Sequence, residues 1–120
     1  MVIYTRLLFW ADGFTLCPGV ILIHPRAKTD KALLAHEQVH AEQMRQEGLI
    51  TWWWAYLTSP AFRQAAEVEA YRAQLALSPY SLDTFAGYLA NNYFLGITEA
   101  HARELLSAPT TAPQQKAPAA

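Results

Sequence analysis

The segment His36-Glu37-Gln38-Val39-His40 has the residue types and the spacing of a metal-dependent hydrolytic site. Two histidines four residues apart lie one turn above each other on a helix, so both imidazole rings can bind one metal ion. Glu37 lies at the edge of the same face, where its carboxylate reaches a metal-bound water but not the metal. The pattern predicts Zn²⁺ as cofactor, His36 and His40 as ligands and Glu37 as general base. The alternative is a pair of helix-surface histidines beside an unrelated glutamate.

The third metal ligand has to come from another part of the chain, because a catalytic zinc site uses three protein ligands and an open fourth position. The remaining histidines are His24 and His101. A better source of a ligand is the segment Ala66–Arg72, which contains Glu67 and Glu69 on a later predicted helix. Residues two positions apart on a helix point about 200° away from each other, so only one of these carboxylates can face the metal.

With these two segments the sequence resembles the gluzincins, the zinc metallopeptidases in which a glutamate on a second helix is the third ligand. The resemblance covers about residues 20–77 and is closest to minimal, single-domain members. It favours Glu67 over Glu69, because the ligand is usually the first glutamate of an E-x-x-A pattern and Ala70 completes that pattern. Some gluzincins carry an aspartate four residues after the ligand, which orients a histidine; here that position is Tyr71.

The resemblance implies a peptidase that hydrolyses an extended peptide or protein substrate. Zinc would lower the pKa of its bound water to about 7 and polarise the scissile carbonyl group. Glu37 would take the proton from that water and pass it to the leaving amine. Tyr71, Tyr93 and His101 are candidates for stabilising the oxyanion, although aromatic residues more often pack in the core. The strand Val20–His24 precedes the motif helix and is expected to pair with substrate as an edge strand, the alternative being an ordinary sheet strand.

A second possible function is a non-catalytic zinc-binding module with a structural or interaction role in a phage or bacterial assembly. Structural zinc sites are closed by four protein ligands, whereas the predicted set has three, which favours the catalytic interpretation. The single cysteine, Cys17, could cap the zinc in a latent form, but a buried thiol is the more ordinary outcome. The sequence does not indicate an oligomeric state.

The elements that must position the site can be predicted from hydrophobic periodicity and from turn residues. The first 24 residues are rich in β-branched and aromatic residues, which predicts a small antiparallel sheet of two or three strands. Asp12-Gly13 is a dipeptide typical of hairpin turns. The segments with strand character are Val2–Thr5, Leu7–Trp10, Phe14–Cys17 and Val20–Ile23.

The rest of the chain has a helical period. The predicted helices cover residues 30–47, 49–57, 60–77, 82–94 and 99–106. Thr29 or Asp30, Ser59 and Thr98 are suitable N-caps for three of them. The expected fold class is therefore α+β, with the small sheet followed by a mostly helical, zincin-like core. Residues 1–107 are predicted to form this domain, and the Pro- and Ala-rich residues 108–120 a disordered tail.

Composition excludes several other classes of protein. The chain has 120 residues, of which 52% are hydrophobic and 16% charged, which fits one folded domain. A formal net charge of -1 without a basic cluster argues against nucleic-acid binding. No stretch reaches the roughly 20 apolar residues of a spanning helix, and the N-terminus does not resemble a signal peptide. With a lone cysteine, these features predict a cytoplasmic protein. The cluster Trp52–Tyr56 could bind a membrane or a partner, but we expect it to pack around the motif helix.

Overall fold

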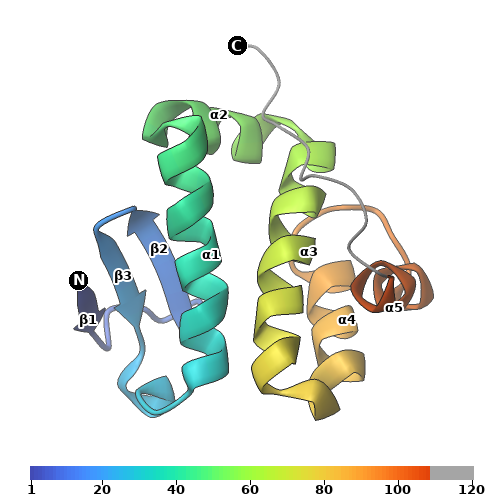
Figure 1. Ribbon diagram of the computed structural model, residues 1–120, viewed down its shortest axis with the longest axis horizontal. Helices are drawn as coiled ribbons and strands as arrows, with labels where there is room; N and C mark the ends of the chain where they lie inside the picture. The colour runs from blue at the N-terminus through green and yellow to red at the C-terminus, as the bar shows by residue number, and fades with distance from the viewer. Residues whose placement is uncertain (109–120) are drawn as a thin grey trace.

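The computed structural model describes residues 1–108, which fold into a three-stranded sheet followed by five α-helices (Figure 1). The predicted α+β fold class is confirmed. The strands are β1 (Val2–Tyr4), β2 (Gly13–Cys17) and β3 (Val20–Ile23). The tail predicted for residues 108–120 lies outside the described residues, except for its first residue.

The sheet is mixed, and the prediction of an antiparallel sheet is wrong for one of its two pairings. β2 and β3 form an antiparallel hairpin, but β1 pairs with β3 in parallel, in the order β1-β3-β2. β1 and β2 are therefore on opposite edges, and residues 5–12 form the connection that crosses between them. The segment Leu7–Trp10 belongs to this connection and is not a strand. Leu8 is buried there, whereas Leu7, Phe9 and Trp10 are exposed.

The turn of the hairpin is Pro18-Gly19, and the prediction that placed it at Asp12-Gly13 is wrong because Gly13 is already the first residue of β2. β3 is the central strand, with neighbours on both sides. The prediction that residues 20–24 form the edge strand is therefore also wrong, and β2 is the edge strand that packs beside the motif helix (Figure 1).

Five α-helices follow the sheet, close to the predicted ranges. They are α1 (Lys31–Glu47), α2 (Leu49–Thr58), α3 (Pro60–Leu77), α4 (Leu82–Asn91) and α5 (Glu99–Ser107), with short 3-10 turns at Pro25–Ala27 and Pro79–Ser81. The side chains of Asp30, Ser59 and Thr98 accept hydrogen bonds from backbone N–H groups at the starts of α1, α3 and α5. α4 ends at Asn91, three residues earlier than predicted, and Phe94 has a φ of 56°, which a right-handed helix does not allow.

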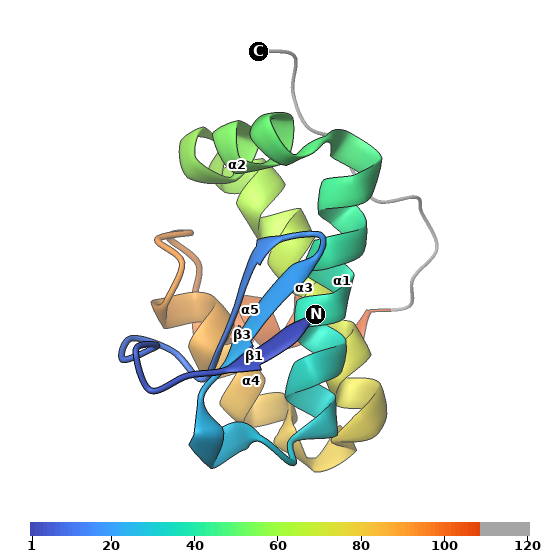
Figure 2. The same ribbon diagram turned by 90° about the vertical axis from the view of Figure 1, so that its left-hand side faces the viewer.

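α1 and α3 lie side by side and antiparallel, and α2 joins them at one end (Figure 1). The sheet covers the other side of α1, while α4 and α5 cover α3 (Figures 1 and 2). Of the tryptophan cluster, Trp52 is buried against Met44 and Phe62, as predicted, whereas Trp54 faces outward. Within residues 1–108, no helix combines the length and apolar character that a membrane crossing requires.

Candidate metal centre

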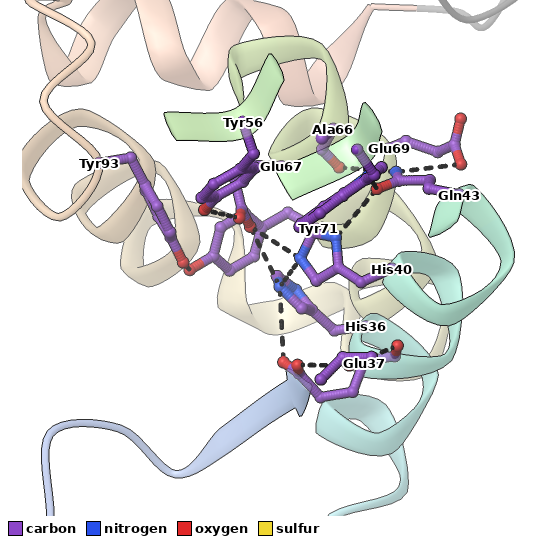
Figure 3. Close-up of polar contacts among 12 residues, drawn as sticks. His36, Glu37, His40, Gln43, Tyr56, Ala66, Glu67, Glu69, Tyr71 and Tyr93 are labelled. Carbon is purple, nitrogen blue, oxygen red and sulfur yellow. Dashed lines mark hydrogen bonds and ion pairs between the residues drawn. The ribbon is translucent and has the colours of Figure 1, made fainter. Parts of the chain in front are cut away.

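α1 and α3 bring His36, His40 and Glu67 together in the gap between the two helices (Figure 3). The two Nε2 atoms are 3.2 Å apart, and Oε1 of Glu67 lies 3.2 Å from each of them. All three side chains are buried. A tetrahedral zinc ion with bonds of about 2.0–2.1 Å holds its ligand atoms about 3.3 Å apart. The three donor atoms thus already have the spacing of three corners of such a tetrahedron, and a nitrogen, nitrogen, oxygen set suits this metal.

Glu67, and not Glu69, faces the histidines. Its position follows from the helix geometry: α3 buries Ala66, Glu67 and Ala70 toward α1, and the two alanines let the helices approach closely. Glu69 points to another part of the interface, where its Oε1 accepts a hydrogen bond from Gln43 at 3.3 Å. The sequence-based preference for Glu67 therefore agrees with the geometry of the site.

Gln43 holds the ring of His40 (Figure 3). Its Oε1 lies 3.0 Å from Nδ1 of His40 and also accepts a hydrogen bond from Nε1 of Trp52 at 3.2 Å. Its amide nitrogen donates to the carbonyl oxygen of Ala66 at 3.1 Å. Because an amide oxygen only accepts, Nδ1 of His40 must carry a proton, which leaves Nε2 for a metal.

His36 is held differently, by packing. Its Nδ1 is buried and has no hydrogen-bond partner. The ring of Tyr71 packs against it, with 4.4 Å between the ring centroids and 73° between the planes. Tyr71, four residues after Glu67 on α3, thus contacts His36 through its ring and not through a hydrogen bond to Nδ1. The hydroxyl of Tyr71 lies 2.6 Å from that of Tyr93.

The charges of the site are strongly coupled. Burial alone lowers the pKa of His40, but the charge of Glu67 and the hydrogen bond to it outweigh burial and raise that pKa to about 9. Burial raises the pKa of Glu67, but His40 and His36 lower it, and the net direction is well below the usual range of a carboxyl group. Without a metal, Glu67 is therefore ionised and His40 protonated at neutral pH. A divalent cation competes with this proton for the same atoms.

Glu37 lies beside the three donors, on the side of β2. Its Oε2 is 3.8 Å from Nε2 of His36, farther than the three donor atoms are from one another. The hydroxyl of Thr15 lies 3.0 Å from Oε1 of Glu37 and 2.9 Å from its backbone oxygen. The backbone of Gly13 lies close to the same side chain: a Cβ atom at Gly13 would lie 3.0 Å from Cγ and 3.3 Å from Oε2 of Glu37. β2 thus holds the Glu37 carboxylate next to the three metal donors, although Glu37 is not one of them.

The site opens into a cleft with two halves. The larger half, about 480 Å³, lies between β2 with its preceding loop and α2. The other half, about 430 Å³, extends along α1 toward Asp12, Arg26 and Asp30. Because His36 and Glu37 line both halves, the group that could carry out hydrolysis is in the middle of the cleft.

The remaining candidates from the sequence fall into two groups. Tyr93 lines both halves of the cleft, and Tyr71 lines the smaller half. His101 is exposed on α5 and lines neither half. His24 also lies outside the cleft, where its Nδ1 accepts a hydrogen bond from the N–H of Arg26 at 3.1 Å. Cys17 lines neither half.

Three residues of the site were not predicted from the sequence to contact it: Thr15, Gln43 and Tyr56, although Tyr56 belongs to the cluster that was expected to pack around the motif helix. The hydroxyl of Tyr56 donates to Oε2 of Glu67 at 2.5 Å, which orients the oxygen Oε1 toward the histidines. Burial, together with the charge of Glu67, raises the pKa of Tyr56, so its hydroxyl stays a donor. Gln43 could have been found, because it lies three residues after His40 on the same helix face. Thr15 and Tyr56 come from other elements and give no local signal.

Replacing Gln43 with methionine is expected to weaken zinc binding by about 10- to 100-fold, the usual effect of removing a residue that orients a metal ligand. The loss arises because His40 no longer has the partner that fixes its ring and its protonation. Competition with a chromogenic chelator measures the affinity. Gln38→Met, at an exposed position of the same helix, is the control. Equal affinities of the two variants would show that Gln43 has no influence on the metal.

No protein family, curated protein or solved structure matches the chain. The case for a function therefore depends on the geometry of these residues.

Proposed function

We propose that the protein is a zinc-dependent peptidase of the type that its sequence resembles, the gluzincins. The observation that carries this proposal is the triangle of His36, His40 and Glu67 donor atoms, 3.2 Å on each side, with Glu37 beside it. The donor group found among the described residues has three members, which leaves a coordination position for water or substrate. This favours catalysis over a structural metal site, which four protein ligands would close.

In this proposal, zinc when bound supplies a Lewis acid that polarises a water molecule and the substrate carbonyl group. Glu37 accepts the proton of the attacking water and delivers it to the leaving amine, while Thr15 keeps the carboxylate in place. Tyr93, at the wall of the cleft, donates a hydrogen bond from its hydroxyl group to the developing oxyanion and retains its proton. Burial raises the pKa of Tyr93 well above its usual value, so the hydroxyl keeps this proton. Tyr71, hydrogen-bonded to Tyr93, orients that hydroxyl.

The substrate would bind along β2 as an additional strand. The N–H of His24 donates to the carbonyl oxygen of Asp12 at 2.8 Å, so the backbone of Asp12 points toward β3. In an antiparallel strand, the backbone N–H and C=O groups of successive residues point to opposite sides. The N–H and C=O groups of Gly13 therefore point away from β3, toward the open edge of β2. An extended peptide paired there passes directly over Glu37, which explains why β2 rather than the predicted β3 supports this mode of recognition.

The first test is metal content after purification, followed by cleavage of peptides with and without a chelator. We expect one zinc per chain, loss of cleavage on chelation and recovery when zinc is returned. A protein that holds zinc and cleaves no peptide would favour the non-catalytic module instead.

The lone cysteine remains the basis for our prediction that the protein works in the cytoplasm.

Replacing Gly13 with alanine is expected to slow peptide cleavage by about 10- to 100-fold, because the added methyl group pushes the Glu37 carboxylate out of position. Zinc affinity should stay unchanged, since Glu37 is not a ligand. Gly19→Ala, in the turn of the same hairpin, is a matched control because its methyl group would meet nothing within 4 Å. Steady-state cleavage rates of the two zinc-loaded variants give the comparison. If Gly13→Ala cleaves as fast as Gly19→Ala, the space above Glu37 is not needed for the reaction.

A further inference from the structure

One wall of the larger half of the cleft is a row of aromatic rings, formed by Trp10, Phe14 and Trp53. The centroids of Trp10 and Phe14 are 5.8 Å apart, and those of Phe14 and Trp53 are 5.7 Å apart. The row continues to Tyr56, 5.8 Å from Trp53, whose hydroxyl binds Glu67. All these rings line the cavity, so this aromatic row leads from the mouth of the cleft to the metal donors.

The loop after α4 contributes Tyr93 to the cleft lining and carries another aromatic ring, Phe94, which lines neither half of the cleft. Phe94 follows Tyr93, which lines the cavity, and is 93% exposed. Its φ of 56° is unfavourable for a bulky residue. Arg63 holds this conformation, because its guanidinium group donates to the carbonyl oxygen of Tyr93 at 2.7 Å and to that of Phe94 at 3.4 Å.

This arrangement is unfavourable for the isolated chain. The backbone of Phe94 is strained, and its side chain lies in water, so the fold itself gains nothing from the ring. Trp10, in the loop between β1 and β2, is also more than half exposed. Figure 2 shows that both loops project on the same side of the molecule, and residues of both line the cleft. A partner outside the chain that packs between the two loops would bury both rings.

We propose that the aromatic row and Phe94 form a specificity subsite for a large apolar or aromatic side chain of the substrate, next to the bond that is hydrolysed. This inference rests on the proposed peptidase function, which places an extended peptide over Glu37. Trp10, Phe14 and Trp53 line the subsite, and the exposed ring of Phe94, on the neighbouring loop outside the lining, would cover the bound side chain from the solvent side. The peptide backbone follows β2, and one of its side chains points toward the row, as the alternation of a strand requires.

The distribution of charge supports an apolar side chain in this half of the cleft. Its lining contains no lysine or arginine, and its carboxylates, Glu37 and Glu67, are both at the metal end. An acidic side chain of the substrate would meet these like charges, and a basic one would have no acidic partner along the row. The smaller half differs, because Asp12, Arg26 and Asp30 line it. The cleft therefore distinguishes the two sides of the hydrolysed bond.

The experiment measures peptide binding without catalysis, using the zinc-loaded Glu37→Gln variant. The probes are fluorescein-labelled decapeptides that differ only in a central Phe, Ser or Glu, and anisotropy gives the Kd. We expect the Phe peptide to bind about tenfold more tightly than either the Ser or the Glu peptide, because only the Phe side chain buries an apolar ring against the row. Adding Trp10→Ser or Phe94→Ser should remove the preference for Phe. Trp54→Ser is the matched control: Trp54 is 58% exposed against 59% for Trp10, but lies on the outer face of α2, away from the cleft.

Equal affinities for the Phe and Ser peptides, or an undiminished preference in Trp10→Ser and Phe94→Ser, would overturn the subsite. Vesicles of phosphatidylcholine form another arm of the test. If the protein binds them and both loop variants abolish that binding without changing peptide preference, the rings serve a lipid surface and the subsite is wrong. Because these measurements use a catalytically disabled protein, they are separate from the peptidase proposal. That proposal fails only if the wild-type, zinc-loaded protein cleaves none of the peptides.

Discussion

The variant His36→Ala is expected to lose stoichiometric zinc binding. His36 supplies one of the three donor atoms spaced 3.2 Å apart, and the two that remain cannot enclose an ion. The effect should exceed the 10- to 100-fold loss that follows removal of an outer partner such as Gln43. The measurement is metal content by mass spectrometry after gel filtration in zinc-free buffer.

The control for this variant is His101→Ala, which removes an exposed histidine outside the cleft and should leave one zinc per chain. A His36→Ala protein that still carries one zinc would place the metal elsewhere and refute the assignment. Thermal unfolding of both variants shows whether the fold is retained, so that loss of metal is not confused with loss of structure.

The variant Glu37→Gln should keep its zinc and lose about 10²- to 10⁴-fold in the rate of peptide hydrolysis. Glutamine has nearly the shape of glutamate and can accept the same hydrogen bond from Thr15, but it cannot take a proton from water. The comparison is the cleavage rate of the zinc-loaded variant with that of Glu42→Gln. Glu42 is on the same helix, is exposed and pairs with Arg45. If Glu37→Gln also loses its zinc, Glu37 is a ligand or a structural residue and the proposed role as base is wrong.

The parts of the site that could be predicted are those that depend on a single helix. The spacing of His36 and His40 fixes their common face on α1, and the limits of α3 follow from Ser59 and from Ser78-Pro79. Helix geometry also requires that only one of Glu67 and Glu69 face the two histidines. These signals are local in sequence, so the same residues that form each helix also determine which side chains converge.

The parts that could not be predicted depend on contacts between distant segments. The pairing of β1 with β3 joins residues about 20 positions apart, and nothing in Val2–Tyr4 indicates a parallel neighbour. Because β1 pairs with β3, β3 is the central strand and β2 is an edge strand, the reverse of what we predicted for residues 20–24. Likewise, Thr15 reaches Glu37 from β2, and Tyr56 reaches Glu67 from α2. The conformation of Phe94 depends on Arg63, some 30 residues earlier in the chain. Each of these depends on tertiary structure and not on local propensity.

The three hydrophobic clusters of the described residues do not merge into one core. One lies between the sheet and α1, one beneath α2, and one among α3, α4 and α5. The space where they would meet, between α1 and α3, is occupied by the polar side chains His36, His40 and Glu67. A bound ion would therefore act as a cross-link between the two halves of the protein, closing a loop of about 30 residues much as a disulfide does. By mass action, the free energy needed to separate α1 from α3 would rise with the concentration of free zinc.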